Sequence, residues 1–503
     1  MSPPPSQHSR HPGGHAGGHP GGHAGGDGVD LSPGPDTIDA ITSGIETKQL
    51  GGKLAGLSLP RQVLVLAFWP LLEQFLQFLV GTVDLALAGH LEPEPLKLTA
   101  TSALGVTSYV MWLMAIIHSS VGVGAAALIA RAIGGRHRRL ANAALGQALL
   151  LAVAGGAVTA AAIFAAARWI GMTAGLEGQS LQLATIYLRI VGPAGAFSAM
   201  LIAGNAAMRA AGDTRTPFVI MTIVNVVNII ASVTFVYAPA PLGGHGVAGI
   251  AAGTFVAWCV GSVISLIVLT RGWGGIHLRL IRLRPHLHTM KRVIRVGAPH
   301  LLEGVLAMWL GNYLVLMVVG RLAVGHSVGA HMIAVRVESL SFLAGFALMT
   351  AAATLTGQYL GLGDPRRARQ AVLLCWAFAA AIMGPMGIVF IFAPRALANI
   401  MTDSPQLLDL CTRPIQICGP IQIFFAMAMV FSGALRGAGD TRTTMWMTAA
   451  SILLVRVPAV YLVGSVLNMG LSAVWVVLCG ELTFRGLLFA ARFAHGGWTK
   501  VKV

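Results

Sequence analysis

Apolar stretches long enough to cross a bilayer follow one another along most of the chain. A hydrocarbon core of about 30 Å needs roughly 20 helical residues at 1.5 Å per residue. Twelve stretches meet this requirement: 61–90, 99–130, 143–168, 184–210, 217–238, 246–270, 297–320, 328–358, 371–393, 413–435, 444–465 and 470–492. Gly, Ala and Ser recur within them, which permits close helix packing in lipid. The pattern predicts an all-α membrane protein with twelve transmembrane helices.

The composition excludes a soluble globular protein. Of the 503 residues, 55% are hydrophobic and only 10% are charged, against roughly 25% charged residues in soluble domains. The net charge of +16 is spread between the apolar stretches and forms no single patch, so we expect no nucleic-acid partner. Five cysteines without a CxxC pair predict neither a disulfide framework nor a zinc site.

The loops between the stretches carry an alternating bias in basic residues. One alternate set of loops holds 24 Lys and Arg, and the opposite set holds five. Lys and Arg are retained on the cytoplasmic side of a membrane. Both termini are therefore predicted to be cytoplasmic, and so is a basic linker at 273–296, which would join lobes at 59–272 and 297–503.

Residues 1–58 are rich in Gly, Pro and His and predict a disordered tail. Within it, four histidines recur at every fourth position, at His11, His15, His19 and His23. Flexible backbone between imidazoles could bring them around a metal ion. A polar tail without a ligand is the simpler interpretation, and a metal-responsive sensor is an alternative that predicts binding without transport. We assign no metal site.

The chain contains an internal repeat at an offset of 227 residues. Arg209 to Thr216 reads RAAGDTRT, and Arg436 to Thr443 reads RGAGDTRT, with seven identities in eight positions. We call these two segments the twin loops. The same offset aligns Gly134 with Gly361. Two homologous bundles of six helices are predicted, and because six is even, a pseudo-twofold axis along the membrane normal relates them.

The twin loops, with the segments around them, resemble the multidrug and toxic compound extrusion family, and most closely its prokaryotic branch. Residues 69–76 (WPLLEQFL) and 83–90 (VDLALAGH) are similar to first-helix patterns of that branch. Residues 330–340 (AHMIAVRVESL) and 357–365 (GQYLGLGDP) are similar to family segments of the eighth helix. The resemblance covers about residues 60–503.

The resemblance implies a secondary antiporter that exports organic cations or amphipathic drugs by alternating access, in exchange for protons or sodium. It implies a bacterial inner-membrane location and small-molecule cationic substrates, with no cofactor and no enzymatic activity. A monomer is expected in the bilayer. The alternative within the same superfamily is a lipid-linked oligosaccharide flippase, which would need a strongly basic cavity. An integral membrane enzyme is not supported, because the apolar stretches contain no hydrolase, metalloprotease or phosphate-loop motif.

Carboxylates within the stretches are the candidate coupling groups, because an ionisable residue in lipid is costly and is a functional hypothesis by default. Glu73, Gln77 and Asp84 fall within about 40° of one another on a helix and form one polar stripe. Asp84 also matches the first-helix aspartate that the resemblance marks as a proton or sodium site. We predict that Asp84 and Glu73 couple transport and that Gln77 contacts substrate.

The second half contributes further candidates. Glu303 follows Pro299 much as Glu73 follows Pro70, so we expect the two glutamates to face each other and Glu303 to contact substrate. His331 and Glu338 share a face of the eighth helix, as a structural pair or as substrate contacts.

Two further features bear on structure and on the coupling ion. Glu481 and Arg485 predict a buried ion pair, and the twin loops predict caps of the following helices. Aspartates that other family members use for ions fall here on Ser232 and near Phe425, which favours protons over sodium.

Overall fold

The computed structural model describes residues 50–51, 54–89, 94–239, 241–272, 275–279, 283–322, 326–402 and 404–501. The chain divides into two units, Met1–Lys48 and Gln49–Val503. The histidines of the predicted tail lie outside the described residues. Every regular element within the described ranges is a helix, which confirms the all-α prediction.

The first half of the described chain comprises α2 to α8. Its elements are α2 (Leu59–Gly89), α3 (Glu94–Gly134), α4 (Arg138–Thr173), α5 (Gly178–Val191), the short 3₁₀ helix η2 (Gly192–Ala194), α6 (Gly195–Ala210), α7 (Arg215–Tyr237) and α8 (Gly246–Arg271). Together, α5, η2 and α6 occupy the fourth predicted stretch. Pro193 in η2 lacks an N–H to continue the α-helical bonding, which accounts for the interruption there.

The second half comprises α9 to η7. Its elements are α9 (Leu287–Leu302), η4 (Glu303–Trp309), α10 (Leu310–Gly320), α11 (Ser327–Gly361), α12 (Pro365–Phe392), α13 (Pro394–Asn399), α14 (Pro405–Cys418), α15 (Gln422–Gly437), α16 (Thr441–Ala449), η5 (Ala450–Arg456), α17 (Val457–Tyr461), η6 (Leu462–Val466), α18 (Gly470–His495) and η7 (Gly497–Lys500). The elements η4, η5 and η6 are π-helical. α9 begins within the predicted linker, so the end of that linker is helical.

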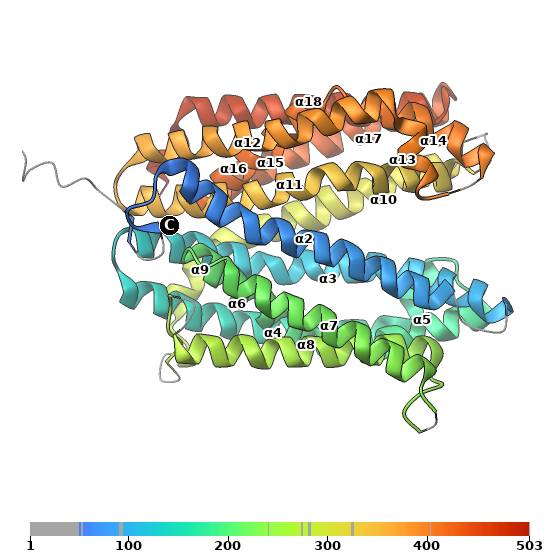
Figure 1. The fold of residues 1–503 in the computed structure, drawn as a ribbon, viewed down its shortest axis with the longest axis horizontal. Coiled ribbons are helices and arrows are strands. Elements are labelled where there is room, and N and C mark those ends of the chain that lie inside the picture. Colours follow the sequence, from blue (N-terminus) through green and yellow to red (C-terminus); the bar gives the residue numbers. More distant parts are fainter. Residues whose placement is uncertain are drawn as a thin grey trace, which may run out of the picture. The chain divides into compact units, whose positions relative to one another are not determined.

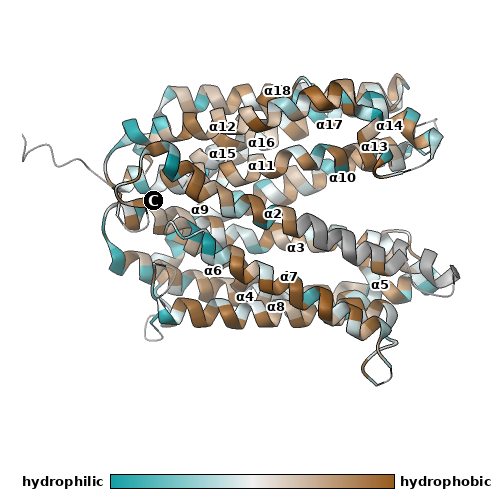
Figure 2. Ribbon diagram, in the orientation of Figure 1, coloured by the Kyte–Doolittle hydropathy of each residue, from teal (hydrophilic) through white to brown (hydrophobic). Residues whose placement is uncertain are grey.

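Ten helices of the described ranges are long and apolar enough to cross a membrane, or eleven if the bent pair of α14 and α15 counts as one span. The two members of that pair meet at 63°. Hydrophobic residues run along the helices and hydrophilic ones gather at helix ends (Figure 2). The protein is therefore a multi-pass membrane protein.

Within residues 49–503, the helices form two groups (Figure 1). Helices α4 to α8 lie on one side and α12 to α18 on the other, with α2, α3, α10 and α11 between them. Each group has its own buried apolar clusters.

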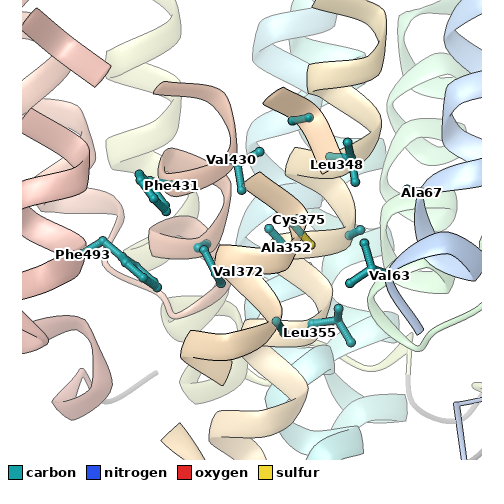
Figure 3. Close-up of a cluster of buried hydrophobic side chains, with 14 of the residues drawn as sticks. Val63, Ala67, Leu348, Ala352, Leu355, Val372, Cys375, Val430, Phe431 and Phe493 are labelled. Carbon is teal, nitrogen blue, oxygen red and sulfur yellow. The ribbon is translucent and has the colours of Figure 1, made fainter. Parts of the chain in front are cut away.

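The first helix of each half begins inside the core of the other half. Val63 and Leu66 at the start of α2 are fully buried in a cluster built from α11, α12, α15 and α18. Figure 3 shows Val63 among side chains of this cluster. Val293 and Val296 of α9 are buried in the cluster of α3, α4, α6 and α8. Each half therefore extends one helix start into its counterpart, and the two lobes are interlocked.

The halves also touch directly where α3 and α11 end. A Cβ added to Gly134 would lie 1.8 Å from the carbonyl oxygen of Gln358, and one added to Gly361 would lie 2.0 Å from that of Arg131. The same offset of 227 residues relates Gly134 to Gly361 and Arg131 to Gln358. Only glycine permits such a close backbone approach on either side.

Candidate functional site

The twin loops connect α6 to α7 and α15 to α16 with the same local geometry. Gly212 and Gly439 have φ angles of +92° and +87°, in the region that glycine adopts without strain. The carboxylate of Asp213 accepts hydrogen bonds from the backbone N–H of Thr216 at 3.2 Å and from its hydroxyl at 2.7 Å. The bond from the backbone of Thr216 is the predicted cap of α7. In the second loop, Asp440 accepts the equivalent hydroxyl bond from Thr443 at 2.5 Å, but its side chain does not cap the backbone of α16, so the predicted cap of that helix is wrong.

The arginine that opens each loop binds a glutamate from the first helix of its own half. Nη1 of Arg209 lies 3.2 Å from both carboxylate oxygens of Glu73. Glu73 is 7% exposed, so the pair is largely removed from solvent. In such surroundings, each charge depends on the other for its stability.

Glu303 makes the corresponding pair in the second half. Nη2 of Arg436 lies 2.7 Å from Oε1 of Glu303, and the hydroxyl of Thr448 donates to the same oxygen at 2.7 Å. Nδ1 of His300 is 3.6 Å from Oε2. Glu303 was expected to face Glu73, but each glutamate instead binds the arginine of its own twin loop.

The Glu73–Arg209 pair lies at the junction of the two halves. The hydroxyl of Thr354 on α11 donates to the carbonyl oxygen of Arg209 at 3.3 Å, and Nε2 of Gln358 donates to that of Ala210 at 2.9 Å. Arg209 therefore contacts the first half through its side chain and the second half through its backbone.

Glu481 lies at the centre of a cluster of charged groups within the second half. Nε of Arg456 donates to its Oε2 at 2.8 Å, and Nε of Arg485 lies 3.4 Å from its Oε1, which confirms the predicted Glu481–Arg485 pair. Ser451 also donates to Glu481. Ser451 and Arg456 are five residues apart, which would place them about 140° apart on an α-helix. The wider turn of η5, with its i→i+5 bonding, brings both to one carboxylate.

His331 and Glu338 do not pair with each other. The thiol of Cys418 on α14 donates to Oε1 of Glu338 at 3.1 Å. The imidazole of His331 packs edge-on against Trp475, with ring centroids 5.6 Å apart. Seven residues on an α-helix span about 10 Å along its axis, so the shared face leaves room for these two separate sets of partners.

The remaining candidates are placed only in part. Gln77 and Asp84 lie on α2, but their side chains lie outside what the structure describes. Ser232, which the resemblance aligns with an ion-binding aspartate, is fully buried, and its Oγ has no hydrogen-bond partner in the described ranges. Trp309 and Tyr313 stack at 5.9 Å, and Nε1 of Trp309 donates to the carbonyl of Tyr109 across the halves at 3.3 Å.

Sequence reasoning missed a buried polar group in the first half. His118 of α3 lies 2.9 Å from the hydroxyl of Thr159 on α4 through Nε2, and 2.9 Å from that of Ser198 on α6 through Nδ1. The three residues lie in different apolar stretches, so no local spacing connects them. Within the ranges that the structure describes, no three His, Cys, Asp or Glu side chains gather as a metal site.

Comparison with known proteins agrees with this architecture. The chain is 27% identical over 441 residues, 88% of its own length and 93% of the relative's, to the probable multidrug resistance protein NorM of Thermotoga maritima. A transporter of the MOP superfamily from Pyrococcus furiosus superposes with a TM-score of 0.81 at 20% identity, over 88% of this chain and 98% of that one. An outward-facing multidrug resistance MATE transporter structure gives a TM-score of 0.81 at 20% identity, over 89% and 98% of the two chains.

The model of the MatE family matches this chain twice, over residues 71–234 and 300–462. Each match starts in the first helix of one half and extends beyond its twin loop, so the repeat seen in the sequence is also a repeat of the family domain. The chain belongs to the MatE family, the multidrug and toxic compound extrusion family that its twin loops resemble.

Proposed function

We propose that this protein is a bacterial inner-membrane antiporter that exports cationic or amphipathic compounds in exchange for protons. The multidrug resistance names of its relatives support drug export. In this proposal α2 is the additional span that completes twelve, a pseudo-twofold axis relates the halves, both termini are cytoplasmic and the protein acts as a monomer.

The contact that carries the proposal is the ion pair of Glu73 with Arg209. Protonation of Glu73 would remove the charge that holds the Arg209 side chain, and the backbone of Arg209 is joined to the second half through Thr354. Proton binding would therefore loosen the junction between the halves, as alternating access requires. Asp84, about three helical turns further along α2, is the proposed partner that passes the proton on.

Substrate would bind between these groups and the second half. The proposed contacts are Gln77 on the polar stripe of α2, Glu303 on η4, and His331 and Glu338 on α11. Arg436 already neutralises the charge of Glu303, so Glu303 would bind a cation only after the Glu303–Arg436 ion pair opens.

The charges observed do not favour the flippase alternative. A pyrophosphate site needs several arginines that are not neutralised, but Arg209 and Arg436 each pair with a glutamate, and Arg456 and Arg485 share Glu481, which leaves one net positive charge there. Arg189 lies over the ring of Phe164 at 5.8 Å. These five arginines therefore do not form the strongly basic cavity that a flippase would need.

Uptake into proteoliposomes tests the proposal. Tetraphenylphosphonium accumulation should follow an imposed proton gradient and not a sodium gradient. Glu73→Gln and Asp84→Asn should each lower the proton-driven rate at least tenfold while energy-independent exchange of labelled substrate persists. Asp409→Asn is the matched control, because Asp409 forms an exposed pair with Arg395 and should leave uptake unchanged. Uptake driven by sodium alone, or unaltered in both variants, would refute proton coupling through α2.

A further inference from the structure

Two arginines share one glutamate in the middle of the second half. Arg456 lies near the centre of the Thr441–Val466 span, and Arg485 lies near the centre of α18. The side chains of Arg456, Arg485 and Glu481 are exposed by only 9%, 10% and 0%. A charge buried at this depth is costly unless it is paired. With two positive charges and one negative charge, the three side chains leave one positive charge over.

Arg456 takes the good acceptors of this cluster. Its Nε and Nη2 lie 2.8 Å and 2.5 Å from Oε2 of Glu481, and its Nη1 donates to Oδ1 of Asn312 at 3.3 Å. The other carboxylate oxygen, Oε1 of Glu481, accepts a hydrogen bond from Ser451. Both oxygens of the glutamate are therefore already occupied by donors other than Arg485.

Arg485 is left with little to bind. Its Nε lies 3.4 Å from Oε1 of Glu481, but this buried atom forms no hydrogen bond in the described ranges. Nη1 donates to Sδ of Met308 at 3.9 Å, and a thioether sulfur is a weak acceptor. Nη2 has no acceptor within the part of the chain that the structure describes. A guanidinium with five N–H donors thus lacks an anionic partner of its own.

The other buried carboxylates of the second half do not supply that partner. Glu303 binds Arg436 at 2.7 Å, and Glu338 accepts from the thiol of Cys418 at 3.1 Å. Neither lies within 4.0 Å of Arg485, whose ion pair among the described residues is the one with Glu481. The positive charge left over is therefore not neutralised by a direct contact with these groups.

The internal repeat shows that the fold does not require this cluster. Helices α7 and α8 are the counterparts, in the first half, of the Thr441–Val466 span and of α18. Their only Asp, Glu, Lys or Arg residues are Arg215 and Arg271, at the two helix ends. The same packing is thus built in the first half without a charge in the middle of either helix, so the cost of the second-half cluster calls for another reason.

We propose that Arg485 is an anion-binding residue of the second half, which takes one monovalent anion, either a halide or a carboxylate. A guanidinium presents paired N–H donors to such an ion, and a low-dielectric environment strengthens their attraction. The single charge left over matches one monovalent anion and not a pyrophosphate. The anion comes either from solution or from the carboxylate of an exported amphipathic compound, and the second source rests on the proposed function.

Thermal unfolding of the purified full-length protein tests the site with chloride. At constant sodium concentration, replacing gluconate by chloride should raise the unfolding midpoint of the wild type by a few degrees, because a ligand of the folded state stabilises it. Arg485→Gln leaves the neutral Arg456–Glu481 pair and should lose this rise. Arg485→Lys keeps the charge and should retain part of it. The matched control is Arg395→Gln, which removes an exposed arginine and should keep the full rise.

Two dyes distinguish the sources of the anion. Rhodamine 110 carries a carboxylate, which is a methyl ester in rhodamine 123. If the site takes the carboxylate of a substrate, Arg485→Gln should weaken rhodamine 110 binding about tenfold in fluorescence anisotropy and leave rhodamine 123 binding unchanged. If chloride stabilises the wild type but not Arg485→Gln, and neither dye is affected, the anion is a free halide.

The proposal is overturned if Arg485→Gln retains the whole stabilisation by chloride. It is also overturned if chloride stabilises neither protein and rhodamine 110 binds both equally. Because these are binding measurements, they do not depend on a gradient. A wild type that takes up no cation under a proton gradient would refute the antiport proposal and leave the result for the anion site as it stands.

Discussion

At the residue scale, glycine determines the geometry of each twin loop. Gly212 and Gly439 occupy the left-handed region, which costs an L-residue with a side chain about 1–2 kcal/mol. This turn lets the aspartate that follows reach the start of the next helix, and it leaves the arginine three residues before the glycine on the last turn of the preceding helix. In the first twin loop, one backbone angle thus positions both the cap and the ion pair.

Gly212→Ala should lower the midpoint of thermal unfolding of the purified protein by a few degrees. The nearest atom to the added Cβ would be Nε2 of Gln358 at 3.5 Å, an ordinary contact, so the cost is conformational. Gly155→Ala is the matched control, because its Cβ would lie in open space on a helix, where alanine is favoured. A midpoint unchanged in Gly212→Ala would contradict the role assigned to this φ angle.

At the element scale, the ends of α3 and α11 form a reciprocal contact through glycine. Gly134 of α3 approaches the backbone of Gln358 in α11, and Gly361 of α11 approaches the backbone of Arg131 in α3. The two contacts are therefore equivalent under the internal repeat. The close approach also allows Gln358 to donate to the carbonyl of Ala210. These helix ends therefore bring the halves together at the same end of the molecule as the twin loops.

Gly134→Ala and Gly361→Ala should have similar effects, because both insert a methyl group into backbone 2.0 Å away or less. We expect each to separate α3 from α11 and to lower proteoliposome uptake at least tenfold. Spin labels on the exposed residues Arg138 and Arg366 should report a longer distance in both variants. An unchanged distance together with full uptake in either variant would show that the contact does not control the junction.

At the scale of the whole molecule, the basic loops predict which end faces the cytoplasm. Cysteine placed at Arg367, in the first turn of α12, should react with an impermeant maleimide only after cells are opened. Cysteine at Leu242, between α7 and α8, should react in intact cells. The measurement is made on a background without the five native cysteines. The opposite labelling pattern would invert the topology and place the twin loops outside.

Much of this architecture could be predicted from the sequence, because membrane helices must satisfy their backbone bonds internally and so leave long apolar stretches. The helical class, the repeat and the Glu481–Arg485 pair follow from such local patterns. The partners of Glu73 and Glu303 do not, because they depend on where a helix lies relative to a loop more than 130 residues away. The contribution of Arg456 was hidden for a different reason, since η5 departs from the α-helical period.

The interlocked first helices imply an order of events as the chain is synthesised. Beyond Leu50, Leu54 and Ala67, the core that buries Val63 and Leu66 is made of residues from Ala347 to Trp498, so the start of α2 leaves the ribosome long before most of its partners exist. The start of α9 finds its partners already made. The two helices occupy equivalent places in the fold, but α2 is synthesised before its partners and α9 after them. The fold is therefore completed only when the start of α2 packs into the second half. Delayed contacts of this kind slow folding and leave apolar surface exposed meanwhile.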